Sequence, residues 1–487
     1  MKKIIVCGAG IGGMVSAILL AHKGYDVEIF EKNLYAGGKM SEFKKDGFRF
    51  DGGPSLITMP DVFKEFFRTV DREINEYFEL EELESSCKYF WEDGTVFNSY
   101  CDENKLYKEL KGVFGESEAA NYRKYIDYGK IFYDLTKDDF LGNEFKIKNY
   151  LTIDGFKNLT KFISGRSVND ISNKFFKNEK LRQLMDRYAT YNGSSPFLAP
   201  QLFSIIPYVE HKFGSWFVKG GIYKIAESLV RLCGEYNIKI NYGYEFTGAD
   251  TSKNKITSLK FKAGTGEVIE IKDFDTVVSN FTNSKDFMDE DYLENDDWSS
   301  SGFILKLGMN KKFSELSHHN ILFSENNEKE FIDIFKNGIP QEDMTIYISI
   351  SCKDDENDAP EGCENWFILV NSPFLSDKFE WTEEIKNKYA ESIISRIDSF
   401  SFVFEKSIRD HILFCDIFTP KDFLEKLNCE NGSIYGLSSN SIYQLMKRPG
   451  NKSGKYSNLY IAGGNSHPGG GVPLCFLSGK IVSQMIN

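Results

Sequence analysis

The sequence lacks several features that would identify common classes of protein. Among its 487 residues there are only 6 histidines, and no group of His and Cys has the spacing of a zinc site. The nine cysteines are an odd number without a C-x-x-C pair, a pattern that is typical of reduced thiols in a cytosolic protein. We therefore expect neither disulfides nor a structural metal.

Basic residues are outnumbered, and repeats are absent. Lys and Arg number 59 against 72 Asp and Glu, so the formal net charge is −13. This charge would repel a phosphate backbone, which excludes a general nucleic-acid binder. No internal repeat or low-complexity tract occurs. Aromatic residues, by contrast, are abundant at 42 Phe and 25 Tyr; they predict a large core, and their total also suits an apolar cavity.

One uncharged stretch, Ile4 to Ala21, is long enough for a signal peptide, a membrane span or a nucleotide site. Its glycines favour the third, because they separate a short apolar run, Ile4 to Cys7, from a helix-like stretch, Met14 to Lys23. A second apolar run, Val27 to Phe30, then leads to Glu31. Strand, glycine-rich turn, helix, strand and acidic residue follow one another as a dinucleotide-binding βαβ unit requires.

The glycines of this turn have separate physical tasks. Gly8 permits the tight turn, Gly10 lets the backbone approach a pyrophosphate, and Gly13 lets the helix lie close to the strand. The helix N-terminus offers free N–H groups and the positive end of its dipole. Glu31 can accept hydrogen bonds from a ribose 2′-hydroxyl and would repel the 2′-phosphate of NADP. These residues alone leave NAD and FAD open.

One segment departs from the acidic background. Between Phe145 and Arg182, nine Lys and Arg stand against three Asp and Glu, a local net charge of +6, and aromatic residues are interspersed among them. Such a segment is a candidate for lying on an anionic membrane surface. A solvated helical face over the core is an equally suitable interpretation.

Two regions of the chain carry patterns of their own. Residues 88–100 predict a β-hairpin with a turn at Asp93 and Gly94, and residues 104–187 have a mostly helical pattern. Strands of a separate sheet are predicted at 303–309, 344–352 and 365–371.

Two further passages are of α/β type. Residues 220–237 have helical spacing, 238–250 predict one strand, and 256–280 predict a hairpin that leads into a buried strand. The C-terminal residues 458–486 combine a strand, a glycine-rich loop and an apolar helix. Together with the N-terminal βαβ unit, these passages predict three separated pieces of one doubly wound domain.

This layout resembles the glutathione-reductase-like FAD enzymes of the amine-oxidase type. The resemblance implies an α/β fold with α+β insertions, in which a discontinuous doubly wound FAD-binding domain carries a substrate domain of mixed sheet and helices. We predict the FAD-binding domain at 1–85, 205–290 and 445–487, and the substrate domain at 86–204 and 291–444, with a membrane-associated helical part near 145–182.

FAD is the cofactor that this resemblance implies. Gly37, Gly38 and Lys39 correspond to the second glycine pair and a basic residue near the pyrophosphate. A helix N-terminus at Gly471 to Pro473 would face the flavin pyrimidine ring and stabilise negative charge on it. The residues predicted to bind FAD are Gly8, Ala9, Gly10, Ile11, Gly12, Gly13, Glu31, Lys32, Gly38, Lys39, Met40, Gly53, Pro54, Ser55, Phe246, Ser279, Gly463, Gly464, Asn465, Gly471, Val472 and Pro473.

Segments along the whole chain narrow the resemblance. "GAGIGGMVSAILLAHKGYDVEIFEKNLYAGGKM", "HHNILFS" and "AGGNSHPGGGVPLCFLSGK" resemble the bacterial phytoene-desaturase-type carotenoid desaturases. Residues 181–200 are most similar to the 1-hydroxycarotenoid 3,4-desaturase branch of that family. Lys39 and Lys219 stand where arginine is more usual, which keeps the charge and loses bidentate geometry.

The resemblance implies an FAD-dependent enzyme that desaturates an acyclic or partly cyclised carotenoid, by hydride transfer to flavin N5 and loss of a proton from the adjacent carbon. A carbocation flanked by conjugated double bonds is delocalised, so electron-rich rings and a dry cavity could supply most of what the reaction needs. The sequence accordingly offers no Ser/His/Asp set and no paired carboxylates with a clear catalytic role. Our candidates for the substrate cavity are Arg187, Tyr188, Tyr191, Asn192 and His467, of which His467 is also interpreted as a residue that shapes its loop.

The branch that residues 181–200 resemble implies 3,4-desaturation of a 1-hydroxycarotenoid, and two alternatives remain beside it. One is another flavin enzyme of this fold, such as a phytoene- or lycopene-forming desaturase, a saturase or an amine oxidase. The other is a lipid-binding escort without a cofactor, like the Rab GDP-dissociation inhibitors; the intact glycine motif and Glu31 speak against it. We expect a cytoplasmic protein attached peripherally to the inner membrane, with oxygen or a quinone as electron acceptor and no nucleic-acid partner.

Overall fold

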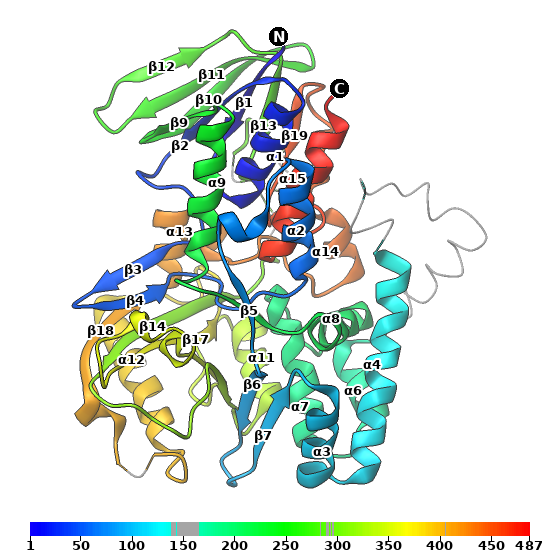
Figure 1. Ribbon diagram of the computed structural model, residues 1–487, viewed down its shortest axis with the longest axis vertical. Coiled ribbons are helices and arrows are strands. Elements are labelled where there is room, and N and C mark those ends of the chain that lie inside the picture. Colours follow the sequence, from blue (N-terminus) through cyan, green and yellow to red (C-terminus); the bar gives the residue numbers. More distant parts are fainter. Residues whose placement is uncertain are drawn as a thin grey trace.

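The structure is a computed structural model that describes residues 1–137, 143, 165–282, 284–288, 292, 294, 297–404 and 406–487. Residues 145–164 of the predicted membrane segment therefore lie outside the described residues. Figure 1 shows an elongated molecule with one sheet near the two termini and a larger sheet at the other end. Among the helices that the structure describes, none combines the length and apolarity needed to cross a bilayer.

The first sheet is parallel and has five strands in the order β19-β13-β1-β2-β9. The three predicted pieces of the doubly wound domain all contribute to it, whereas the borders predicted for the two domains stay predictions. The strands are β1 (Lys3–Cys7), β2 (Asp26–Glu31), β9 (Lys239–Tyr242), β13 (Thr276–Ser279) and β19 (Leu459–Ile461).

Alternate residues of the central strand β1 serve two different cores. Ile4 and Val6 pack with α1, α2, α9 and α15 on one face, and Ile5 and Cys7 pack with the antiparallel strands β10, β11 and β12 on the other. Burial on both faces explains the uninterrupted apolar run of β1. The bounds are α1 (Ile11–His22), α2 (Pro60–Thr69), α9 (Tyr223–Glu235), α15 (Val472–Met485), β10 (Tyr244–Ser252), β11 (Lys255–Ala263) and β12 (Val268–Ile271).

The prediction of a single strand at 238–250 was wrong, because this segment forms two strands. It forms β9 in the parallel sheet and β10 in the three-stranded sheet. Gly243 separates the two strands with φ +76°, a left-handed conformation that breaks an extended strand. The chain thereby passes from the edge of one sheet to the layer that covers it.

The second sheet has seven strands in the order β18-β14-β17-β16-β15-β6-β7. It contains the strands that were predicted for a separate sheet, and the predicted hairpin, β6 with β7, extends it by parallel pairing of β6 with β15. The strands are β6 (Ser85–Phe90), β7 (Val96–Tyr100), β14 (Ser301–Met309), β15 (His319–Leu322), β16 (Ile346–Ser349), β17 (Glu364–Ser372) and β18 (Ile412–Phe418).

Helices cover this second sheet. α12 (Glu383–Asp398) packs on Phe303, Leu305 and Leu307 of β14. A helical layer packs on Tyr89 and Phe97 of the hairpin, in agreement with the helical pattern of the described residues between 104 and 187. Its members are α3 (Glu103–Phe114), α4 (Glu116–Thr136), α6 (Val168–Phe175), α7 (Glu179–Arg187) and α8 (Ile205–Phe213).

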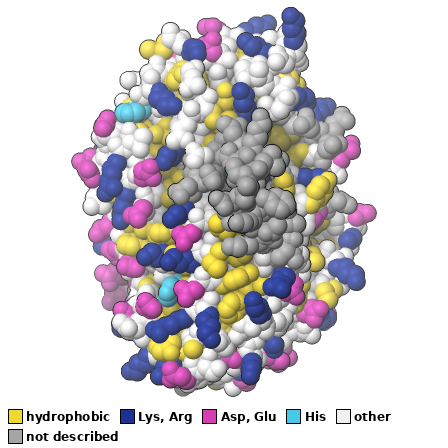
Figure 2. All heavy atoms as spheres, turned by 90° about the vertical axis from the view of Figure 1, so that its right-hand side faces the viewer, with side chains coloured by type: hydrophobic (Ala, Val, Ile, Leu, Met, Phe, Trp, Pro, Cys, Tyr) yellow, Lys and Arg dark blue, Asp and Glu magenta, His cyan; other side chains and the backbone are white. Residues whose placement is uncertain are grey.

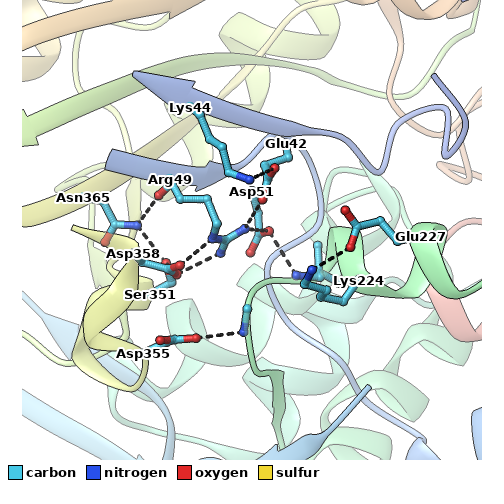
Figure 3. Close-up of polar contacts among 12 residues, drawn as sticks. Glu42, Lys44, Arg49, Asp51, Lys224, Glu227, Ser351, Asp355, Asp358 and Asn365 are labelled. Carbon is cyan, nitrogen blue, oxygen red and sulfur yellow. Dashed lines mark hydrogen bonds and ion pairs between the residues drawn. The ribbon is translucent and has the colours of Figure 1, made fainter. Parts of the chain in front are cut away.

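A buried ionic network fixes β4 (Phe48–Asp51), which pairs with β3 (Glu42–Lys45) (Figure 3). Arg49 donates hydrogen bonds to Asp51 (2.7 Å) and to Asp358 (2.5 and 2.9 Å). Asp51 also accepts the backbone N–H of Ile222, directly before α9. β4 leads into residues 52–55, so this network fixes the strand before a segment that lines the site described below.

Candidate functional site

The glycine-rich turn is packed so closely that side chains are excluded from it. Gly8 has φ +101°, and a Cβ on Gly13 would lie 2.3 Å from the carbonyl oxygen of Gly8. A Cβ on Gly10 would lie 2.2 Å from Oδ1 of Asn280. The turn and the start of α1 therefore expose backbone N–H groups where a phosphate can approach.

The C-terminal loop is seated directly on this turn. A Cβ on Gly12 would come within 2.8 Å of the backbone of Gly463, and Ala462 donates its N–H to the carbonyl of Ser279. The N-terminal motif and the loop that leads to α15 thus form one wall, although 451 positions separate Gly12 from Gly463.

Asn280 is a residue of this wall that the sequence analysis missed. Its side chain lies against Gly8, Gly10 and Gly13, and its amide donates to the carbonyl of Ala462 at 2.6 Å. Its position could have identified it, because Asn280 lies one residue beyond the carboxyl end of β13 and parallel sheets bind ligands at that edge. The neighbouring Ser279, which was predicted, is fully buried and donates to the carbonyl of Phe281.

Glu31 lies at the carboxyl end of β2 and is 7% exposed. Burial raises the pKa of its carboxyl, although that carboxylate accepts hydrogen bonds from the backbone N–H groups of Ala9 (2.7 Å) and Asn33 (2.8 Å). A carboxylate has about four acceptor sites, so two remain for ribose hydroxyls. Lys32, also predicted, donates to Asn428 at 2.8 Å.

Three cavities follow one another from Glu31 into the molecule. The first, of about 350 Å³, lies beside Glu31 and is also lined by Gly8, Gly10, Lys32, Gly38, Phe246 and Asn280. The second, of about 280 Å³, shares Gly10, Gly38 and Asn280 with the first. Its other predicted residues are Ile11, Gly12, Lys39, Met40, Gly53, Pro54, Gly463, Gly464, Asn465, Gly471 and Val472.

The third cavity, of about 270 Å³, adjoins the second, because Gly53, Pro54, Gly471 and Val472 line both. It reaches from the N-terminus of α15 to the end of α7. Residues that line the third cavity include Ser55, Arg187, Tyr191, His319, Ile321, Phe323, Glu330, Thr345, Tyr347, Tyr435 and Pro473.

Two of the five predicted substrate residues line this third cavity. The buried guanidinium of Arg187 lies 5.5 Å from the ring centroid of Tyr89 and 5.2 Å from that of Tyr191, so aromatic faces surround the cation. Tyr191 donates its hydroxyl to Glu210 at 2.6 Å. Glu210 lies on α8 and had not been predicted.

The other three predicted substrate residues are absent from the linings of the described cavities. Tyr188 donates its hydroxyl to Glu210 at 2.7 Å, and Asn192 donates its amide to Ser439 at 2.6 Å. His467 is buried and its Nε2 pairs with the backbone carbonyl of Asn143 at 3.0 Å. The short 3₁₀ turn after α7 thus directs neighbouring side chains to different partners.

The third cavity also has polar residues to which the sequence gave no individual role. His319 belongs to the quoted segment "HHNILFS" and pairs with the hydroxyl of Tyr347. Glu330 accepts hydrogen bonds from Ser324 and Thr345, and burial raises the pKa of its carboxyl to about 7. Both residues lie far in sequence from the glycine motif, so no local pattern assigns them to the site.

The residues present fit FAD. Glu31 has free acceptor sites for a ribose, the turn and α1 offer N–H groups to a pyrophosphate, and the N-terminus of α15 meets the shared wall of the second and third cavities. Lys39 lines the second cavity and donates to Asn465 at 3.3 Å. Among the described residues, no group of three His, Cys, Asp or Glu side chains could hold a metal ion.

Comparison with known proteins adds relatives over the full length. Residues 6–72 match the model of a family described as an NAD(P)-binding Rossmann-like domain. The chain is 36% identical over 491 residues to a 1-hydroxycarotenoid 3,4-desaturase from Flavobacterium, with 100% of this chain and 99% of that protein covered. It is 30% identical over 503 residues to a 4,4′-diapolycopene oxygenase from Methylomonas, with 100% and 98% covered.

A solved structure of putrescine oxidase shares the fold. Its TM-score is 0.63 at 12% sequence identity, and the match covers 100% of this chain and 98% of that one. The similarity confirms the predicted fold class, an α/β fold like that of this amine oxidase.

Proposed function

Because this chain belongs to the family of FAD-dependent carotenoid desaturases and oxygenases, we propose that it introduces the 3,4 double bond into a 1-hydroxycarotenoid. The observation that carries the proposal is the 36% identity, along the whole chain, to a protein with that named activity. The third cavity supports the proposal. It is lined by aromatic and aliphatic side chains and a few polar groups, and it adjoins the second cavity, in which the cofactor is proposed to bind.

FAD supplies the hydride acceptor for this reaction. The residues of this chain would bind the cofactor and fix its orientation. The glycine motif, the loop before α15 and Glu31 would hold the dinucleotide. The N-terminus of α15 would offer the positive end of its dipole to negative charge on the flavin. Arg187 and Tyr191 border the cavity beyond that wall. The rings of Tyr191, Phe323 and Tyr435 keep water out and face a delocalised cation with electron-rich surfaces.

The test is turnover with defined carotenoids. Protein reconstituted with FAD is incubated with phytoene, lycopene and a 1-hydroxylated acyclic carotenoid, and products are analysed by mass. We expect the hydroxylated substrate to lose two hydrogens. Turnover of phytoene alone would indicate a general desaturase instead. A product that has gained oxygen would indicate an oxygenase. Oxygenase activity is the second candidate function because the chain is 30% identical to the diapolycopene oxygenase.

For the electron acceptor we propose oxygen or a quinone. The two are separated by running the same reaction without oxygen and then adding a soluble quinone. Turnover that stops without oxygen and is not restored by the quinone identifies oxygen.

We also propose that the protein attaches peripherally to the inner membrane, where its insoluble substrate resides. Figure 2 shows hydrophobic and basic side chains beside the residues drawn in grey, on the side where α4 and α14 (Ile442–Lys447) lie in Figure 1. Ile131 of α4 and Tyr443 and Met446 of α14 are exposed, and Nζ of Lys447 lies 4.6 Å from the ring centroid of Tyr443. Exposed apolar residues next to cations suit an anionic bilayer surface.

Liposome flotation tests this attachment. Binding should rise with anionic lipid and fall with salt. The double substitution Tyr443→Ser and Met446→Ser should weaken binding. Leu413→Ser is the control, because Leu413 is similarly exposed and lies on β18, at the left of Figure 1 and away from α14. It should leave binding unchanged. Equal binding by both variants would contradict the assignment of this face.

A further inference from the structure

His319 lines the third cavity and carries a buried polar atom without a hydrogen-bond partner among the described residues. Its side chain is 2% exposed and lines the third cavity at the start of β15. Nδ1 pairs with the hydroxyl of Tyr347 at 2.8 Å, but the buried Nε2 has no hydrogen-bond partner among the described residues. A buried polar atom left unpaired is destabilising, so a ligand that pairs with Nε2 recovers this lost free energy.

The charge state of this imidazole limits which ligand suits it. Burial lowers the pKa of His319 well below its usual range, and the neighbouring His318 and Arg187 lower it further, so the ring is neutral at physiological pH. A neutral ring offers at Nε2 either one N–H or one lone pair. A hydroxyl group can serve either form, since it both donates and accepts. A protonated amine would instead be repelled by the cation of Arg187, which lines the same cavity.

The imidazole ring of His319 is also connected to the residues that separate the second cavity from the third. The Tyr347 hydroxyl that pairs with His319 also pairs with Ser55 at 2.6 Å, and Ser55 follows Gly53 and Pro54, which line both cavities. In a 1-hydroxycarotenoid a single carbon lies between the oxygen-bearing C1 and C3, one of the two carbons that are oxidised. The hydroxyl must therefore be held close to the flavin end of the cavity.

We propose that Nε2 of His319, oriented by Tyr347 and Ser55, binds the hydroxyl group of the carotenoid and makes the enzyme select hydroxylated substrates. This inference rests on the proposed function and names the specificity residue of that site. Asn192, a predicted residue of the substrate cavity, does not take this role, because its amide donates to the hydroxyl of Ser439. Arg187 borders the same space, but its guanidinium is surrounded by the rings of tyrosines.

His318 provides a matched control. It precedes His319 in the chain, its Nδ1 pairs with Asp354 at 2.7 Å, and it is absent from the lining of the described cavities. The experiment compares the FAD-loaded wild type with His319→Leu, His319→Gln and His318→Leu. Each is assayed for kcat/KM on a 1-hydroxylated acyclic carotenoid and on an analogue of equal conjugation without the hydroxyl.

We expect His319→Leu to lower kcat/KM for the hydroxylated substrate roughly 10- to 100-fold, the equivalent of one buried hydrogen bond left unmade, while the analogue changes little. His319→Gln should recover part of the loss, since its terminal amide can reach the place of Nε2. His318→Leu should preserve the preference. Flavin absorption and the Tm of each variant show that the site is folded, and quenching of tryptophan fluorescence gives the Kd of each carotenoid without turnover.

Two results would overturn the inference alone: an equal loss on both substrates in His319→Leu, or an equal loss of preference in His318→Leu. A wild type that fails to turn over the hydroxylated substrate would overturn the proposed function and this inference together. Loss of preference confined to His319→Leu, with recovery by glutamine, supports the assignment.

Discussion

Arg49 and Asp358 form a buried bidentate ion pair across 309 positions of sequence, with Nε to Oδ1 at 2.5 Å and Nη2 to Oδ2 at 2.9 Å. Both side chains are less than a tenth exposed. Two parallel charge-assisted hydrogen bonds fix the guanidinium plane, and with it β4 and the segment that follows it into the cavities.

Breaking this pair should strongly destabilise the protein. In Asp358→Asn, the buried Arg49 loses a full counter-charge, which we expect to lower the free energy of unfolding by about 3–5 kcal/mol. Urea unfolding measures the change. The exposed pair of Lys260 and Asp250 is the control, since Asp250→Asn should change stability little. Equal effects of the two substitutions would show that Arg49 does not depend on its partner.

Gly12→Ala should weaken FAD binding by pushing the C-terminal loop away from the glycine turn. The added Cβ would meet the backbone of Gly463 at 2.8 Å, and overpacking of this kind costs about 1–3 kcal/mol, or roughly 10- to 100-fold in affinity. Gly234→Ala is the control, because no atom lies within 4 Å of its added Cβ in α9. Titration of apoprotein with FAD measures both; unchanged affinity in Gly12→Ala would contradict the close seating of the loop.

Glu31→Gln should reduce FAD affinity through loss of charge-assisted hydrogen bonds at the first cavity. Each such bond contributes roughly 1.5–3 kcal/mol. Glu28→Gln, on the same strand but paired with Lys3 and Lys239, should leave the affinity unchanged. Flavin fluorescence during titration gives the Kd values, and equal behaviour of the two variants would remove Glu31 from the cofactor site.

Glu330→Gln should change how stability depends on pH. The native carboxyl, with a pKa raised from 4.5 to about 7, keeps its proton in this interval while the unfolded chain releases it. Stability of the wild type therefore falls as pH rises through the interval, by about 3 kcal/mol from this group. The variant lacks this contribution. The free energy of unfolding of the variant, relative to that of the wild type, should therefore rise between pH 5 and pH 8. A constant difference across these pH values would show that Glu330 is ionised in the native state.

Local patterns determined much of this protein. The βαβ unit, the hairpin around Asp93 and Gly94, and the C-terminal strand, loop and helix follow from short apolar runs, helical spacing and glycines at turns. These signals span a few residues and act before any distant contact forms, so sequence reasoning can find them. The same locality explains why residues 238–250 were predicted as one strand, since only the left-handed Gly243 separates the two strands.

Tertiary structure alone decided which side chains share the site. Asn280 meets the glycine turn because β13 lies beside β1, and His319 enters the third cavity because β15 pairs with β6 and β16. Arg187 and Tyr191 line the cavity while Asn192 turns to Ser439, since successive side chains of a tight helical turn point in different directions. The sequence thus determined the elements, and the packing of distant strands and loops determined the chemistry of the cavity, because that packing depends on contacts between residues hundreds of positions apart.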